Sequence, residues 1–133
     1  MVMASVASPQ AVTTAVASHL ILGKEGEEQA AQYLRTQGMP ILGRNIRIAR
    51  DEIDILAFDP LDEVLVFAEV KTRKKSQPDF PALLGATAKK RARLHRAAHA
   101  WVNAHCYAGG FRVDLVCVEG GKIVLHVKEL PVE

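Results

Sequence analysis

Two short apolar segments carry charged side chains at a spacing that could bind a metal ion. Asp54 lies in the first segment, 51–56, and Glu69 and Lys71 lie in the second, 66–71. Both segments are rich in Val, Ile, Leu and Phe and are separated by a polar turn, so we predict the two strands of a hairpin. Because side chains alternate along a strand, Glu69 and Lys71 point to the same face. Charged groups in an apolar strand cost free energy unless they are paired or bind a metal.

The chemistry that fits this spacing is hydrolysis assisted by a divalent cation. Asp54 and Glu69 supply the oxygen ligands that Mg²⁺ prefers. Lys71 could orient a metal-bound water, while the cation neutralises charge on a phosphoryl oxygen under attack. The alternative is a salt bridge between Lys71 and one of the carboxylates, which is the usual role of an isolated Glu-x-Lys. An Asp followed about fifteen residues later by Glu-x-Lys on a second apolar strand is much less common by chance.

Asp54 together with Glu69-Val70-Lys71 resembles the PD-(D/E)xK signature of restriction-endonuclease-like nucleases. The wider sequence resembles the YraN-like family of that superfamily. The matching segments, in the family's order, are 23–34, 44–47, 52–54, 67–73, 90–94 and 112–116. The resemblance implies a nuclease-like fold without a settled substrate. Family members usually have Gly directly before Glu-Ile-Asp, where this chain has Asp51. A Gly there would suggest a positive φ, which Asp tolerates better than most residues.

The helix predicted over 20–37 carries a third carboxylate of interest. Ala30, Ala31 and Leu34 form an apolar stripe, and Glu27 lies on the same face. In the superfamily that the chain resembles, a Glu on the first helix often joins the metal site, and Glu27 occupies the matching position. The alternative is that Glu27 only favours the helix dipole.

The basic residues are concentrated in one stretch of the chain. The net charge is only +2, but 71–96 contains nine Lys or Arg and one acid. Such polarisation suits a phosphate backbone; the alternative is a solvated helix face beside a basic loop. The candidate phosphate contacts lie in the loop after Lys71 and on the helix predicted over 82–104. They are Lys74, Lys75, Lys90 and Arg93.

Other features limit the functional classes. A zinc site would need a second paired set of ligands at the usual spacing, and the sequence lacks one beside the candidates. Those candidates are His95, His99, His105 and Cys106. Two cysteines do not make a disulfide scaffold, so we expect a cytoplasmic protein. No apolar run approaches the roughly 20 residues of a membrane span, so we expect no membrane partner.

The predicted order is helix, three strands, long helix, two strands. The remaining strands are predicted at 41–48, 111–118 and 123–127. A long helix between strands implies parallel neighbours, whereas the hairpins are antiparallel. We therefore predict an α/β protein with a restriction-endonuclease-like mixed central sheet of about five strands flanked by helices. Residues 1–19 are expected to form a flexible N-terminal tail, and residues 20–133 a single nuclease-like domain.

The leading hypothesis is a nuclease that depends on Mg²⁺ or Mn²⁺ and hydrolyses phosphodiester bonds. Asp54 and Glu69 would bind the metal, Lys71 would position the attacking water, and Glu27 would assist. The alternative is a nucleic-acid-binding or partner-binding module that cleaves poorly or only within an assembly. The intact Asp/Glu/Lys set favours the enzyme, and the modest net charge favours the module. We expect DNA rather than RNA as the nucleic acid. A homodimer is an open alternative to a monomer, because small nucleases of this kind often use two copies to cut two strands.

Overall fold

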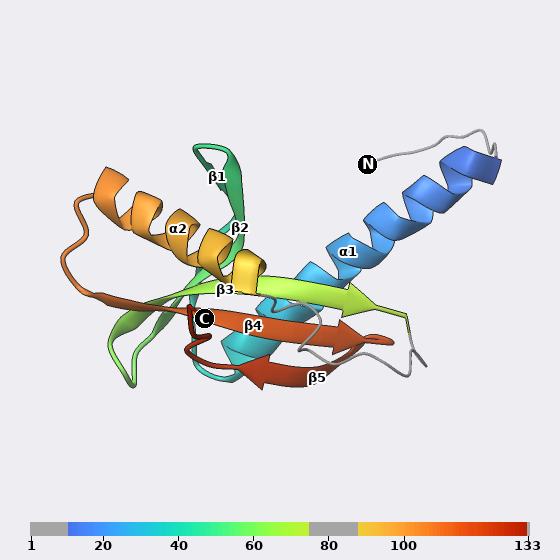
Figure 1. Ribbon diagram of the computed structural model, residues 1–133. Helices are drawn as coiled ribbons and strands as arrows, with labels where there is room; N and C mark the ends of the chain where they lie inside the picture. The colour runs from blue at the N-terminus through green and yellow to red at the C-terminus, as the bar shows by residue number, and fades with distance from the viewer. Residues whose placement is uncertain (1–10, 75–87, 133) are drawn as a thin grey trace.

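The described residues form two helices and five strands (Figure 1). This computed structural model describes residues 11–74 and 88–132. The elements are α1 (Ala11–Thr36), β1 (Ile41–Ile48), β2 (Asp51–Asp59), β3 (Val64–Arg73), α2 (Ala88–Ala104), β4 (Gly110–Glu119) and β5 (Lys122–Val127). All five predicted strands are present.

The strands form one mixed sheet in the order β1-β2-β3-β4-β5. Three neighbouring pairs are antiparallel, whereas β3 and β4 are parallel and are separated in the chain by α2. A helix is needed there because parallel neighbours cannot be joined by a tight turn. The predicted mixed central sheet of five strands flanked by helices is confirmed.

The helices cover opposite faces of the sheet (Figure 1). Leu34 of α1 belongs to the apolar core on one face, together with Val66 and Val116. Leu94 of α2 belongs to the core on the other face. Since both faces are covered, β4 is buried at every position from Arg112 to Val118, as expected for a strand with a parallel neighbour.

The first helix is longer than predicted. It begins at Ala11, and the prediction that it begins at Leu20 is wrong by nine residues. The earlier residues, mostly Ala, Ser, Val and Thr, contain no charged residue that would mark an amphipathic stripe, yet Ala has the highest helix propensity. Of the expected tail, residues 11–19 are therefore helical, and residues 1–10 lie outside the described residues. Gly38, with φ of 88°, ends the helix as predicted.

An ion cluster is buried on the α1 face of the sheet. Arg112 donates from Nε to Asp114 Oδ1 at 2.9 Å and from Nη1 to Asp59 Oδ2 at 2.8 Å. The other oxygen of Asp114 lies 2.8 Å from His126 Nε2, and Nδ1 of that ring lies 2.9 Å from the Tyr33 hydroxyl. Burial would raise the pKa of Asp114, but the hydrogen bonds with His126 and Arg112 outweigh it and lower the pKa. The cluster ties α1 and the β2–β3 turn to β4 and β5.

We predict that Arg112→Met lowers the free energy of unfolding by about 3 kcal/mol at pH 7, because two buried carboxylates lose their partner. The folded-state pKa values of Asp59 and Asp114 lie below the usual value, so their contribution is present at neutral pH and is lost as the pH falls through them. Urea unfolding should show the deficit shrinking from pH 7 toward acid. The control Arg35→Met removes an exposed charge and should change stability by less than about 0.5 kcal/mol. A deficit that is independent of pH would contradict the electrostatic origin.

Candidate active site

The candidate site lies where β2 and β3 separate. The two strands pair only between the Asp59–Val64 end and the Ile55–Ala68 pair. Beyond that pair, β2 continues along β1 while β3 continues along β4. Figure 1 shows the β1–β2 hairpin leaning away from the other three strands. A fork therefore opens in the sheet at the residues that follow Ala68.

Asp54 occupies this fork. The antiparallel register places it opposite Glu69, one step beyond the last paired residues. Its Oδ2 accepts a hydrogen bond of 2.8 Å from the backbone N–H of Val70. A buried N–H that loses its ladder partner needs another acceptor, and the Asp54 carboxylate supplies it. The same contact holds Asp54 beside Glu69.

The carboxyl groups of Asp54 and Glu69 form an acidic pair in which each affects the pKa of the other. Burial, followed by the charge of Asp54, raises the pKa of Glu69 to about 7. Burial also raises the pKa of Asp54, against the hydrogen bonds from Val70 and Glu69 that lower it. Two carboxylates this close cannot both ionise readily unless a cation lies with them. The pair therefore holds a proton near neutral pH or accepts a positive ion.

Lys71 and Lys90 provide the positive charge beside this pair. Lys90 Nζ lies 3.8 Å from Glu69 Oε2, and the Glu69 side chain is 13% exposed. Within the described residues the ion pair of Glu69 is thus with α2 and not with Lys71. The charge of Lys90, followed by burial, lowers the pKa of Lys71. A lysine with a lowered pKa is better able to exchange a proton with a water molecule.

Glu27 approaches the pair from α1. Gly26 packs against the side chain of Thr72, where a Cβ would collide, so the helix can lie close to β3. Burial and then the charge of Asp54 raise the pKa of Glu27. Across the described part of the chain, however, no three His, Cys, Asp or Glu side chains form a group that could hold a metal. Glu27 is therefore near the pair without completing a set of three carboxylates.

The histidines considered for zinc have other contacts. His95 Nε2 lies 2.7 Å from the carbonyl oxygen of Leu130, and His105 Nδ1 lies 2.9 Å from that of Trp101. The ring of His99 packs edge-on against Phe111. These contacts agree with packing roles for α2.

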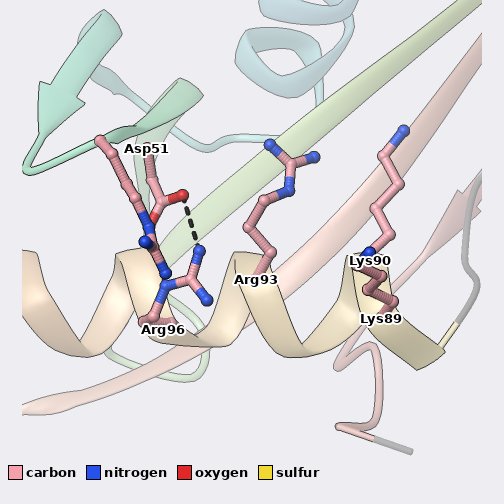
Figure 2. A pocket seen from close by; sticks show the side chains of 6 residues that line it. Asp51, Lys89, Lys90, Arg93 and Arg96 are labelled. Carbon is pink, nitrogen blue, oxygen red and sulfur yellow. Dashed lines mark hydrogen bonds and ion pairs between the residues drawn. The ribbon is translucent and has the colours of Figure 1, made fainter.

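A cationic cleft of about 620 Å³ lies beside α2 (Figure 2). Its lining residues are Arg50, Asp51, Lys89, Lys90, Arg93 and Arg96. Lys90 and Arg93 also lie close enough to Glu69 for their charges to act on its pKa, opposing its rise. Two residues of the cleft wall therefore lie near Glu69, although neither Asp54 nor Glu69 is among the lining residues.

The four predicted phosphate contacts do not all lie in the cleft. Lys90 and Arg93 line the cleft, Lys74 is exposed just after β3, and Lys75 lies outside the described residues. Sequence reasoning did not select Arg50, Lys89 and Arg96 as contacts. The spacing of Lys90, Arg93 and Arg96, each three residues apart, was a signal that could have added Arg96.

Comparison with protein families assigns the chain. The model of the uncharacterised protein family UPF0102 matches residues 26–118. The chain belongs to this family. The matched range includes the acidic pair, Lys71 and all of the cleft residues.

Curated UPF0102 proteins are similar along most of the chain. The protein from Arthrobacter sp. (strain FB24) is 51% identical over 103 residues, covering 74% of this chain and 81% of the relative. That from Halorhodospira halophila is 43% identical over 105 residues, covering 76% and 79%. That from Streptomyces coelicolor is 41% identical over 114 residues, covering 80% and 85%.

One similar solved structure is that of a repair endonuclease from Pyrococcus abyssi, with a TM-score of 0.44 and 17% sequence identity. The similarity covers 96% of this chain and 50% of that chain, so this protein spans about half the length of the endonuclease.

We predict that Glu69→Gln stabilises the metal-free protein at pH 8 by about 2 kcal/mol. The folded-state pKa of about 7 exceeds the usual 4.5, so the stability that the protonated Glu69 contributes is complete below pH 4.5 and is lost as the pH rises through 7. Gln cannot ionise and should avoid this loss. Thermal unfolding with a chelator at pH 5 and pH 8 measures the effect, with the exposed Glu63→Gln as the matched control. Equal behaviour of the two variants at pH 8 would contradict the raised pKa.

Proposed function

We propose that this protein is a metal-dependent nuclease that hydrolyses phosphodiester bonds of nucleic acid, with DNA the expected substrate before RNA. The observation that carries the proposal is the pairing of Asp54 with Glu69 in the fork of the sheet. Lys71 and a cationic cleft lie beside this pair. This combination of acidic ligands with a phosphate-attracting surface suits metal-assisted hydrolysis of a phosphodiester bond.

The residues present fit a hard divalent cation, Mg²⁺ or Mn²⁺. Asp54 and Glu69 would hold it through oxygen atoms, and Glu27 could reach it through a water molecule. Such a cation usually keeps several waters and is bound by one or two carboxylates together with substrate phosphates. Two protein ligands therefore suffice. When bound, it would supply an activated water and neutralise charge on the phosphate.

The basic residues have separate roles in this proposal. Lys71, with its pKa lowered by Lys90, would orient the attacking water and take part in its deprotonation. Lys90 and Arg93, on the cleft wall, would hold phosphate groups of the substrate. Lys90 faces both regions because it also pairs with Glu69.

A second candidate is a binding module that uses the cleft without cleaving. It is favoured by the absence, in the described part of the chain, of a group of three metal-ligating side chains. In that case the acidic pair would be a protonated structural element, and only the cleft would contact nucleic acid.

A cytoplasmic location and a homodimer belong to the same proposal. Both cysteines are free, with Cys106 exposed and Cys117 buried. No helix in the described residues is long and apolar enough to cross a membrane. Two copies would be needed to cut both strands of a duplex at one time.

We predict that the purified protein cleaves nucleic acid with Mn²⁺ or Mg²⁺ and not with a chelator. Glu69→Gln should abolish cleavage because it removes a metal ligand. Lys71→Met should lower the cleavage rate by about 10²- to 10⁴-fold. Single-stranded, duplex and branched oligonucleotides should be tested in a gel assay.

The matched controls for this assay are Glu63→Gln and Lys128→Met, which remove exposed charges away from the fork and should leave the rate unchanged. Binding that is retained in Glu69→Gln supports the nuclease. If the wild-type protein binds every substrate and cleaves none with either metal, the binding module is the correct function.

A further inference from the structure

The cleft contains a row of three cations on one side of α2. Lys90, Arg93 and Arg96 are three residues apart, and Figure 2 shows Lys90 and Arg93 extending from the same side of the helix. The rise of 1.5 Å per residue makes the row about 9 Å long. Phosphates follow one another about every 3.4 Å along the axis for each strand of a duplex. The row is therefore between two and three such intervals long, which is long enough for its three cations to contact three consecutive phosphates of one strand.

The chemistry of the lining favours the backbone over the bases. Among the described residues, every lining residue besides Asp51 is Lys or Arg, and none is aromatic or an amide. This described part of the lining offers no ring on which a base could stack and no Asn or Gln for a bidentate contact with adenine. Contacts of cations with phosphates carry no sequence information.

Asp51 occupies the far end of this row. Arg96 donates to it from Nε at 3.1 Å and from Nη2 at 2.9 Å (Figure 2). The Asp51 side chain is 7% exposed, and that of Arg96 is 49% exposed. In the turn between β1 and β2 the residue with positive φ is Ala49, at 55°, and not Asp51. Asp51 is the first residue of β2, and its side chain reaches across to α2. A bidentate pair of this kind holds the guanidinium in a fixed orientation.

We propose that the row on α2 binds two consecutive phosphates of one nucleic-acid strand and that Asp51 sets this number by occupying Arg96, the third cation of the row. The inference rests on the proposed function for the identity of the ligand. Asp51 is then a specificity-determining residue, because its ion pair with Arg96 withdraws one cation from the strand. Lys90 and Arg93 remain for the strand that leads away from the acidic pair.

The test measures how binding of a fluorescent single-stranded oligonucleotide depends on salt, in the presence of a chelator so that no cleavage occurs. Each phosphate contact with a single strand contributes about 0.7 to the slope of log affinity against log salt. Arg93→Gln should reduce the slope by about 0.7, whereas Arg96→Gln should leave it unchanged because Asp51 already holds this arginine. Asp51→Asn should steepen the slope by about 0.7, since it releases Arg96.

The double variant Asp51→Asn/Arg96→Gln should return to the wild-type slope. This result would show that the steeper slope of Asp51→Asn comes from the released Arg96 and not from a general loosening of the fold. Lys122→Gln removes an exposed cation at the start of β5; it is the matched control and should have no effect. Thermal unfolding confirms that each variant is folded.

The inference is overturned if Arg96→Gln flattens the slope as much as Arg93→Gln, if Asp51→Asn leaves it unchanged, or if the wild-type protein does not bind. If the salt slopes are as expected but the protein does not cleave with metal, the phosphate-binding cleft is supported and the nuclease function is contradicted. If the protein cleaves with metal but the slopes do not change with substitution at Asp51, Arg93 or Arg96, the nuclease function is supported and the inference about the cleft is contradicted.

Discussion

The hydrogen bond from the Val70 N–H to Asp54 is the contact on which the site depends. It forms because β2 and β3 stop pairing after Ile55 and Ala68, which leaves the half-buried backbone donor of Val70 without a partner in β2. By accepting this bond, the Asp54 side chain links β2 to β3 within the fork and lies next to Glu69. The fork thus produces a buried acidic pair from two strands that are otherwise apolar.

The second helix connects the acidic pair to the cleft. Leu94, Ala97 and Ala98 are buried against the sheet, so the rotation of α2 about its axis is fixed. That rotation places Lys90 beside Glu69 and carries the remaining cations along the cleft. Packing of small and apolar residues on one side of a helix therefore determines where positive charge meets the acidic pair on the other.

The sequence predicted the elements of the site better than their contacts. Alternation within two apolar segments was enough to place Asp54 and Glu69 on neighbouring strands, because strand period and hairpin pairing are local properties. The extent of β2–β3 pairing is a tertiary property, so neither the fork nor the bond to Val70 could be predicted. The pairing of Glu69 with Lys90, and of Asp51 with Arg96, joins residues far apart in the chain and depends on how α2 docks. The only indication of this docking in the sequence is the three-residue spacing of Lys90, Arg93 and Arg96, which places these cations along one side of α2 without showing what they contact.

The central claim is that the Asp54–Glu69 pair receives a divalent cation in place of its proton. The most direct measurement is anomalous diffraction at the manganese absorption edge from crystals of the protein soaked in Mn²⁺ at pH 8. The account predicts an anomalous peak within coordination distance of both carboxylates, together with its loss in crystals of Glu69→Gln. Crystals that diffract well and show manganese only elsewhere on the surface, or no manganese at all, would contradict it.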